Sequence, residues 1–191
     1  MSLLKKFSVK VPKNIRILYL SKKNIIVFIG PLGKKMLKLK LKLFFQPVNY
    51  LIYVERKSDS MLLKNQKQLL KALQGTIVAM LKQCILEVSI ALYKKLELRG
   101  VGYKVYLLKK DLYPILHFTL GYSHSLFFKI ESNNLKVLTQ KATNLFIFGN
   151  SYNKISCFAS HLRSFKYPEP YKGKGILYQN EKIALKEGKK I

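Results

Sequence analysis

Acidic residues are scarce in this chain. Only nine Asp and Glu residues stand against 36 Lys and Arg residues, which gives a formal net charge of +27 on 191 residues. Positive charges at this density repel one another unless a polyanion neutralises them, so the composition predicts a nucleic-acid partner. An enzyme acting on nucleic acid is the weaker alternative, because the acids are not paired and His117, His124 and His161 are scattered.

Cysteine and long apolar runs are also lacking. Cys84 and Cys157 show no CxxC pair and no zinc-site spacing, so we interpret both as small buried residues in a reducing compartment, and we expect no metal or cofactor. No uninterrupted apolar run approaches the roughly 18 residues that span a bilayer. Strand-like residues 7–12 follow the start of the chain so soon that we expect no signal or transit peptide.

Hydrophobic residues nevertheless make up 49% of the chain, which is too many for a disordered basic tail. Alternating strand patterns followed by one helical pattern occur twice. The first copy ends in a helical pattern over residues 66–85 and the second in one over residues 153–165. We therefore predict an α+β fold with two tandem, similar domains, residues 1–85 and 86–165, each an antiparallel sheet packed against a helix. A chance match of two apolar patterns is the alternative.

Within the first copy, Lys38 to Leu43 alternates strictly between lysine and leucine, which predicts a strand with one apolar and one basic face. The lysines would contact RNA or DNA, or would be solvated and protect an edge strand. The preceding segment, Gly30 to Lys35, lacks the spacing of a phosphate-binding loop, so we interpret it as a hairpin turn.

The last residues of the chain, 166–191, are predicted to form an extended basic C-terminal arm. Pro168 and Pro170 favour extended backbone, and Gly173 and Gly175 let the main chain lie close to another surface. The neighbouring lysines and exposed amides would suit phosphate oxygens. A solvated basic tail is the alternative.

Three motifs follow one another in the second half of the chain. They are LELRGVGYK at residues 96–104, LGYSH at residues 120–124, and Arg163 followed by PEPYKGKG at residues 168–175. In that order they resemble the universal large-subunit ribosomal protein L-six family, and residues 9–12 and 30–33 extend the resemblance over nearly the whole chain. Where the family has Ser-His-Pro, this chain has Ser123-His124-Ser125, and residues 44–63 match nothing in the family pattern.

The resemblance implies a structural constituent of the large ribosomal subunit that acts in translation and is not an enzyme. Its expected partners are large-subunit rRNA near the sarcin–ricin loop, neighbouring ribosomal proteins and, transiently, translational GTPases, with no membrane and no small-molecule substrate. The Gly100 and Gly102 pair is expected to serve a bulge or tight packing. The positions expected to face RNA are Lys94, Lys95, Lys104, Tyr122, Ser123, His124, Arg163, Lys166, Tyr171, Lys172, Gly173, Lys174 and Gly175.

Two further expectations concern location. Heavy use of Lys, Ile, Leu, Phe, Tyr and Asn, with no Trp, resembles translation of a very AT-rich gene. This favours an organelle-encoded protein of the mitochondrial ribosome in the matrix, followed by a plastid protein and then one of the bacterial cytoplasm. A peripheral membrane protein could use the same positive charge on anionic lipids, but the lysine faces belong to predicted strands rather than to a basic amphipathic helix.

Overall fold

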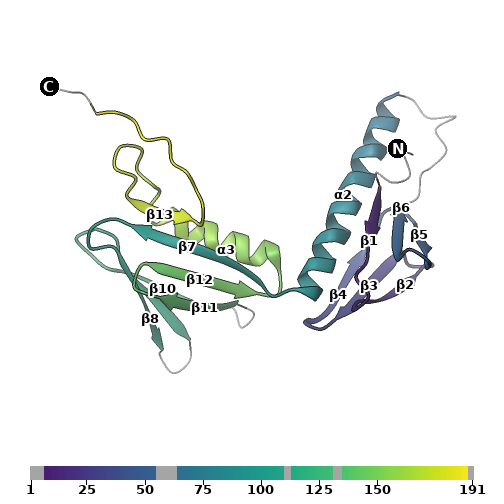
Figure 1. Ribbon diagram of the computed structural model, residues 1–191, viewed down its shortest axis with the longest axis horizontal. Helices are drawn as coiled ribbons and strands as arrows, with labels where there is room; N and C mark the ends of the chain where they lie inside the picture. Colours follow the sequence, from purple (N-terminus) through teal and green to yellow (C-terminus); the bar gives the residue numbers. More distant parts are fainter. Residues whose placement is uncertain (1–6, 55–63, 110–112, 131–134, 189–191) are drawn as a thin grey trace. The chain divides into compact units, whose positions relative to one another are not determined.

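The computed structural model describes residues 7–54, 64–109, 113–130 and 135–188. The fold is α+β, and the chain divides into two compact units, Met1–Ala91 and Leu92–Ile191 (Figure 1). The division follows Ala91, whereas the sequence pattern placed it after residue 85. The difference arises because the helix of the first unit continues to Ser89.

The described part of the first unit contains two three-stranded antiparallel sheets and the helix α2 (Lys64–Ser89). One sheet has the order β1-β6-β5, with β1 (Ser8–Lys10), β6 (Leu51–Val54) and β5 (Leu43–Gln46). The other has the order β2-β3-β4, with β2 (Arg16–Leu20), β3 (Ile25–Gly30) and β4 (Gly33–Lys38). Helix α2 packs against both sheets and closes one core between them.

Helix α2 confirms the helical pattern at residues 66–85 and extends beyond it at both ends. Ile77, Leu81, Ile85 and Val88 are buried at helical spacing against the sheets. Leu69 and Met80, two other apolar residues of this pattern, are exposed instead. Among the described residues, α2 is the helix that is long and apolar enough, by length and composition alone, to cross a membrane, a test that core helices of soluble proteins also pass.

The turn at Gly30 to Gly33 is the predicted hairpin, because these two glycines pair directly across β3 and β4. The predicted strand from Lys38 to Leu43 is wrong as hydrogen-bonded structure. β4 ends at Lys38 and β5 begins at Leu43, and the residues between them join no sheet. The alternation itself is real, since Leu39, Leu41 and Leu43 are buried while the lysines between them are exposed.

The described part of the second unit contains a four-stranded sheet, a three-stranded sheet and the helix α3 (Tyr152–Ser164). The four-stranded sheet has the order β11-β12-β7-β13, with β11 (Leu135–Gln140), β12 (Asn144–Gly149), β7 (Leu92–Arg99) and β13 (Gly175–Tyr178). The other has the order β10-β9-β8, with β10 (Leu126–Lys129), β9 (Pro114–Thr119) and β8 (Lys104–Lys109). All of these strand pairs are antiparallel.

Helix α3 confirms the second helical pattern and covers one face of the sheet formed by β12, β7 and β13 (Figure 1). Ile155, Ala159 and Leu162 point into the core of this unit. The expectation of two buried thiols is wrong for Cys157, which is exposed on α3, whereas Cys84 on α2 is half-buried. Burial raises the pKa of the Cys84 thiol.

The predicted extended C-terminal arm is corrected in its middle part. Residues Gly175 to Tyr178 form β13, which pairs with β7, and Ile176 and Leu177 are completely buried. The apolar residues of this segment gain more from burial in the sheet than from exposure in an arm. Residues 181–188 have no helix or strand.

Candidate nucleic-acid interface

Residues 168–174 form a closed loop directly before β13. The Gly173 N–H donates a hydrogen bond to the Glu169 carbonyl, and the Glu169 N–H donates one to the Lys174 carbonyl, both at 2.9 Å. The amide of Gly173 is therefore used inside the loop rather than offered to a phosphate. These two bonds make the loop a fixed platform instead of a compliant chain.

The loop directs its polar side chains outward. Tyr171 and Lys172 are exposed, and Lys174 is half-buried. The Lys186 N–H donates to the Pro170 carbonyl at 2.9 Å, which ties the segment after β13 to the loop. The cations of this region therefore come from two stretches of chain that the backbone holds together.

Gly175 is required by the way the loop closes. A Cβ built on this residue would lie 2.7 Å from the Pro168 Cα and 2.8 Å from the Tyr167 carbonyl oxygen. Its φ of +149° is also unfavourable for a residue with a side chain. The glycine thus allows the backbone at the start of β13 to lie against the backbone of residues 167–168.

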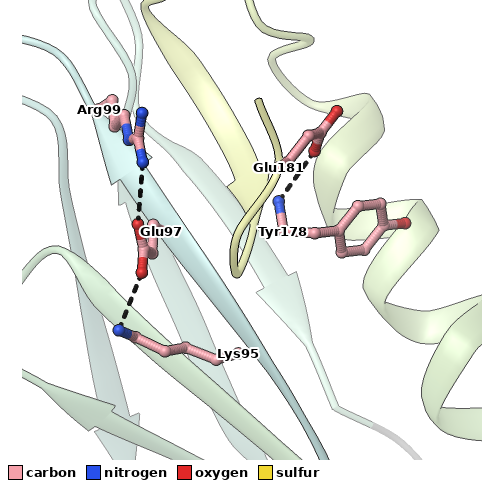
Figure 2. A network of polar contacts seen from close by, with 5 residues as sticks. All are labelled: Lys95, Glu97, Arg99, Tyr178 and Glu181. Atoms are coloured by element: carbon pink, nitrogen blue, oxygen red, sulfur yellow. Dashed lines mark hydrogen bonds and ion pairs between the residues drawn. The ribbon is translucent and has the colours of Figure 1, made fainter. Parts of the chain in front are cut away.

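Arg163 is engaged within the unit. Its Nη2 lies 2.6 Å from Glu181 Oε1, and its guanidinium lies 5.2 Å from the centre of the Tyr178 ring. Glu181 Oε2 accepts a hydrogen bond from the Tyr178 N–H at 3.0 Å, as Figure 2 shows. Burial raises the pKa of the Tyr178 hydroxyl. This network fixes the turn after β13 against α3.

A strip of alternating charges lies on β7, on the face opposite α3. Glu97 lies between two cations, with Lys95 Nζ 2.9 Å and Arg99 Nη2 3.3 Å from its carboxylate oxygens (Figure 2). The hydrogen bond from Lys95, with a further one from Arg99, lowers the pKa of the Glu97 carboxyl. One carboxylate thus pairs with two cations, which leaves a net positive charge on this face of β7.

Lys94 and Lys95 are adjacent in sequence but lie on opposite faces of β7. Lys94 Nζ lies 5.2 Å from the centre of the Tyr178 ring and 5.4 Å from that of Tyr152, within the range of a cation–π contact. The structure therefore does not bring the two lysines together as one binding pair.

The predicted turn at residues 122–124 joins a second group of polar side chains. The Tyr122 hydroxyl donates to the Phe165 carbonyl at 3.0 Å, and Lys166 Nζ lies 4.1 Å from the centre of the Tyr122 ring. The rings of Tyr122 and His124 are stacked, with centroids 5.9 Å apart and planes at 17°. Tyr122, His124 and Lys166 form one cluster, with Ser123 exposed beside them.

A cleft of about 970 Å³ lies between the end of β7, the loop and the segment after β13. Four cations line it, Arg99, Lys172, Lys174 and Lys182, together with Glu181, whose carboxylate is already paired with Arg163. A concave surface with this surplus of positive charge suits phosphate groups of a polyanion.

Arg99 and Lys182 are cleft residues that the sequence reasoning missed. Arg99 follows the alternation of β7, which is the signal that could have placed it beside Lys95 and Glu97. Lys104, which was predicted, does not line the cleft. It is exposed at the start of β8, opposite Thr119 in the other sheet of the unit.

No three His, Cys, Asp or Glu side chains among the described residues are grouped so that they could hold a metal ion. Gly100 and Gly102 have positive φ angles. A Cβ on Gly100 would meet the Tyr103 ring, in agreement with the predicted tight packing, whereas a Cβ on Gly102 would meet no atom within 4 Å.

Comparison with known proteins gives a consistent result, although no protein-family model matches the chain. The chain is 35% identical to the large ribosomal subunit protein uL6 of Mycoplasmoides gallisepticum over 181 residues, which cover 95% of this chain and 92% of that protein. It is 34% identical to uL6 of Chloroherpeton thalassium over 189 residues, covering 99% and 98% of the two chains. It is 38% identical to uL6 of Staphylococcus aureus over 166 residues, covering 87% and 86%.

These relatives are bacterial, so they give no support to the mitochondrial location expected from composition and are compatible with the bacterial alternative. The resemblance to the L-six family is confirmed, because the similarity extends over nearly the full length of both partners in the first two comparisons. The chain belongs to the uL6 family of large ribosomal subunit proteins.

Proposed function

We propose that this protein is a structural, non-catalytic constituent of the large ribosomal subunit, and that its second unit binds large-subunit rRNA near the sarcin–ricin loop. Neighbouring ribosomal proteins would be permanent partners, and translational GTPases would pass close by. Family membership supports the ribosomal role. The observation that carries the RNA contact is the cationic cleft at Arg99, Lys172, Lys174 and Lys182.

The two units are proposed to be tandem copies of one α+β domain. Each has six described strands followed in sequence by a helix that packs on them, with β13 added after the helix of the second unit, which supports a duplication. The C-terminal arm is proposed to consist of the loop before β13 and the basic segment after it, rather than of one continuous extended strand.

Binding would rest on charge and shape. Lysines and arginines neutralise phosphates and release counterions, which positions the protein without reading a base sequence. Of the predicted residues, Tyr171, Lys172, Lys174 and the cluster of Tyr122, His124 and Lys166 are the best placed for such contacts. Arg163 and Gly175 would instead hold the interface in shape.

Replacement of Lys172 and Lys174 by Ala tests the proposal. Because the variant loses two phosphate contacts, its plot of log affinity against log salt concentration should be less steep, with a slope smaller in magnitude by roughly 1.4–1.8. The measurement is a filter-binding or fluorescence titration of a large-subunit rRNA fragment containing the sarcin–ricin loop, at several salt concentrations.

The matched control replaces Lys22 and Lys23, two exposed lysines of a turn in the first unit, and so removes the same total charge. Its slope should stay within about 0.5 of the unaltered protein, because these lysines lie far from the cleft in the sequence and in another unit. Equal slopes for the two double variants would exclude the loop from the RNA interface.

A further inference from the structure

Three aromatic rings cross the solvent face of the β10-β9-β8 sheet in one row. Tyr106, His117 and Phe127 are directly paired across the three strands. The centroids of the Tyr106 and His117 rings are 6.2 Å apart with planes at 20°, and those of His117 and Phe127 are 4.8 Å apart with planes at 21°. The rings therefore form one nearly parallel column.

The column is accessible at both ends. Phe127 is 65% exposed and Tyr106 is 42% exposed, while His117 between them is half-buried. β10 and β8 are the two edges of this sheet, so no further strand of the described residues pairs beside either outer ring. A flat group can thus extend the column at Phe127 without moving the backbone, whereas on the Tyr106 side the Val105 N–H donates to the Ala142 carbonyl at 2.7 Å.

Two cations share the strands of the rings. Lys104 lies two residues before Tyr106 and Lys129 two residues after Phe127, so both share the face of the column. Lys129 Nζ also lies 4.2 Å from the centre of the Tyr113 ring. No Asp or Glu occurs in β8, β9 or β10. A ligand that suits this surface combines flat apolar groups with negative charge between them.

We propose that Tyr106, His117 and Phe127 form a stacking site for unpaired bases of RNA, with Lys104 and Lys129 beside the phosphates. Every base has a flat face that can stack on an aromatic ring, and single-stranded stretches leave those faces free. This inference rests on the proposed RNA-binding function and adds a site separate from the cleft, since none of the three aromatic residues lines the cleft.

One of the two sheets of the first unit provides an internal contrast. In the sheet of β2, β3 and β4, the residues that pair across the centre are Leu18, Val27 and Met36. That row is apolar but has no ring, so it offers no stacking partner to a base. The column in the second unit therefore differs in chemistry and not merely in exposure.

The test uses the purified full chain and a short oligoadenylate with a central 2-aminopurine, whose fluorescence falls when the base stacks on an aromatic ring. Binding should quench the fluorescence at moderate salt. Phe127→Leu and Tyr106→Leu should each weaken binding about five-fold or more, which is the lower range for loss of one base–aromatic stack. An oligonucleotide made of abasic sites alone should bind equally to all variants.

The matched control is Phe44→Leu, which removes a similarly exposed phenylalanine, 58% accessible, from strand β5 of the first unit. It should bind the oligonucleotide like the unaltered chain. Thermal unfolding of each variant checks that the fold is retained. Quenching of 2-aminopurine by the unaltered chain tests the stacking site without any substitution.

The outcomes separate the two proposals. If the unaltered chain binds the rRNA fragment but neither binds nor quenches the oligoadenylate, the stacking site is refuted and the proposed function stands. If Phe127→Leu and Tyr106→Leu bind as tightly as Phe44→Leu, the stacking site is also refuted, and an acidic protein partner becomes the better occupant. If the chain binds no RNA of either kind, the proposed function itself fails.

Discussion

Replacing Gly175 by Ala is the sharpest test of how the loop of the candidate interface is built. The new methyl group would meet the Pro168 Cα at 2.7 Å, the Pro168 nitrogen at 2.8 Å and the Tyr167 carbonyl oxygen at 2.8 Å. All three are backbone atoms, so no side-chain rotation can relieve the clash. Because ordinary contacts are about 3.5–4.0 Å, the two segments would have to separate by roughly 1 Å.

Two costs add at this position. Overpacking in a filled site costs about 1–3 kcal/mol, and a side chain at a φ normally reserved for glycine costs about 1–3 kcal/mol more. We therefore expect a loss of about 2–6 kcal/mol in the unfolding free energy of the second unit. For a domain of about 100 residues, even the lower figure lowers Tm by at least about 8 °C.

The assay is thermal and urea unfolding of the full chain, followed by the near-ultraviolet signal of the tyrosines, because nine of the 12 lie in the second unit. Gly102→Ala is the matched control, because Gly102 has a φ of +76° but a Cβ there meets no atom within 4 Å. It should show the backbone cost alone. If Gly175→Ala were no less stable than Gly102→Ala, the close approach of residues 167–168 would not be the reason for the glycine.

Two smaller predictions follow from helix and charge chemistry. Gly75 lies exposed inside α2, and a Cβ there would meet no atom within 4 Å. Gly75→Ala should therefore raise the unfolding free energy of the first unit by about 0.5–1 kcal/mol, measured by urea unfolding. An unchanged unfolding free energy would contradict a helix at this position. Hydrogen bonds from Lys95 and Arg99 hold the pKa of Glu97 below the usual value, about 4.3. The carboxylate therefore stabilises the second unit above about pH 4.3, and this contribution is lost as the pH falls through its lower folded pKa. Glu97→Gln should lose less stability than the unaltered chain over that acid range, measured by urea unfolding at a series of pH values, and an identical acid dependence would contradict the network.

The elements that the sequence predicted best are those whose signal is local. Helices α2 and α3 follow from apolar residues at helical spacing, and the hairpin at Gly30 follows from turn residues between two strand patterns. The ends of α2 were missed by a few residues because its last turn, to Ser89, is held by packing of Val88 rather than by a cap in the sequence.

Burial patterns were mistaken for hydrogen-bonded structure at Lys38 to Leu43. Alternation reports which side chains point to the core, and Leu39 and Leu41 do so. It does not report whether the backbone between them has a strand beside it. Cys157 shows the converse limit, since its apolar character suggested burial, yet its position on α3 faces solvent.

Part of the candidate site was predicted from motifs in the sequence, and the rest depends on the pairing of strands that are far apart in the chain. The loop at residues 168–175 could be recognised in the sequence, but the cleft also needs Arg99 and Lys182. Arg99 reaches the loop because it pairs with Gly175 across β7 and β13. That contact joins residues far apart in the chain, and no local pattern encodes it.

The glycines and lysines of the loop divide one task between them. Gly173 and Gly175 looked like positions for close approach to RNA, yet the Gly173 N–H donates to the Glu169 carbonyl and a Cβ on Gly175 would clash with Pro168. The glycines therefore determine the conformation of the loop, and that conformation places Lys172 and Lys174 at the cleft. It follows that a change at Gly175 should reduce stability and RNA binding together, whereas changes at the two lysines should reduce RNA binding and leave unfolding nearly unaltered.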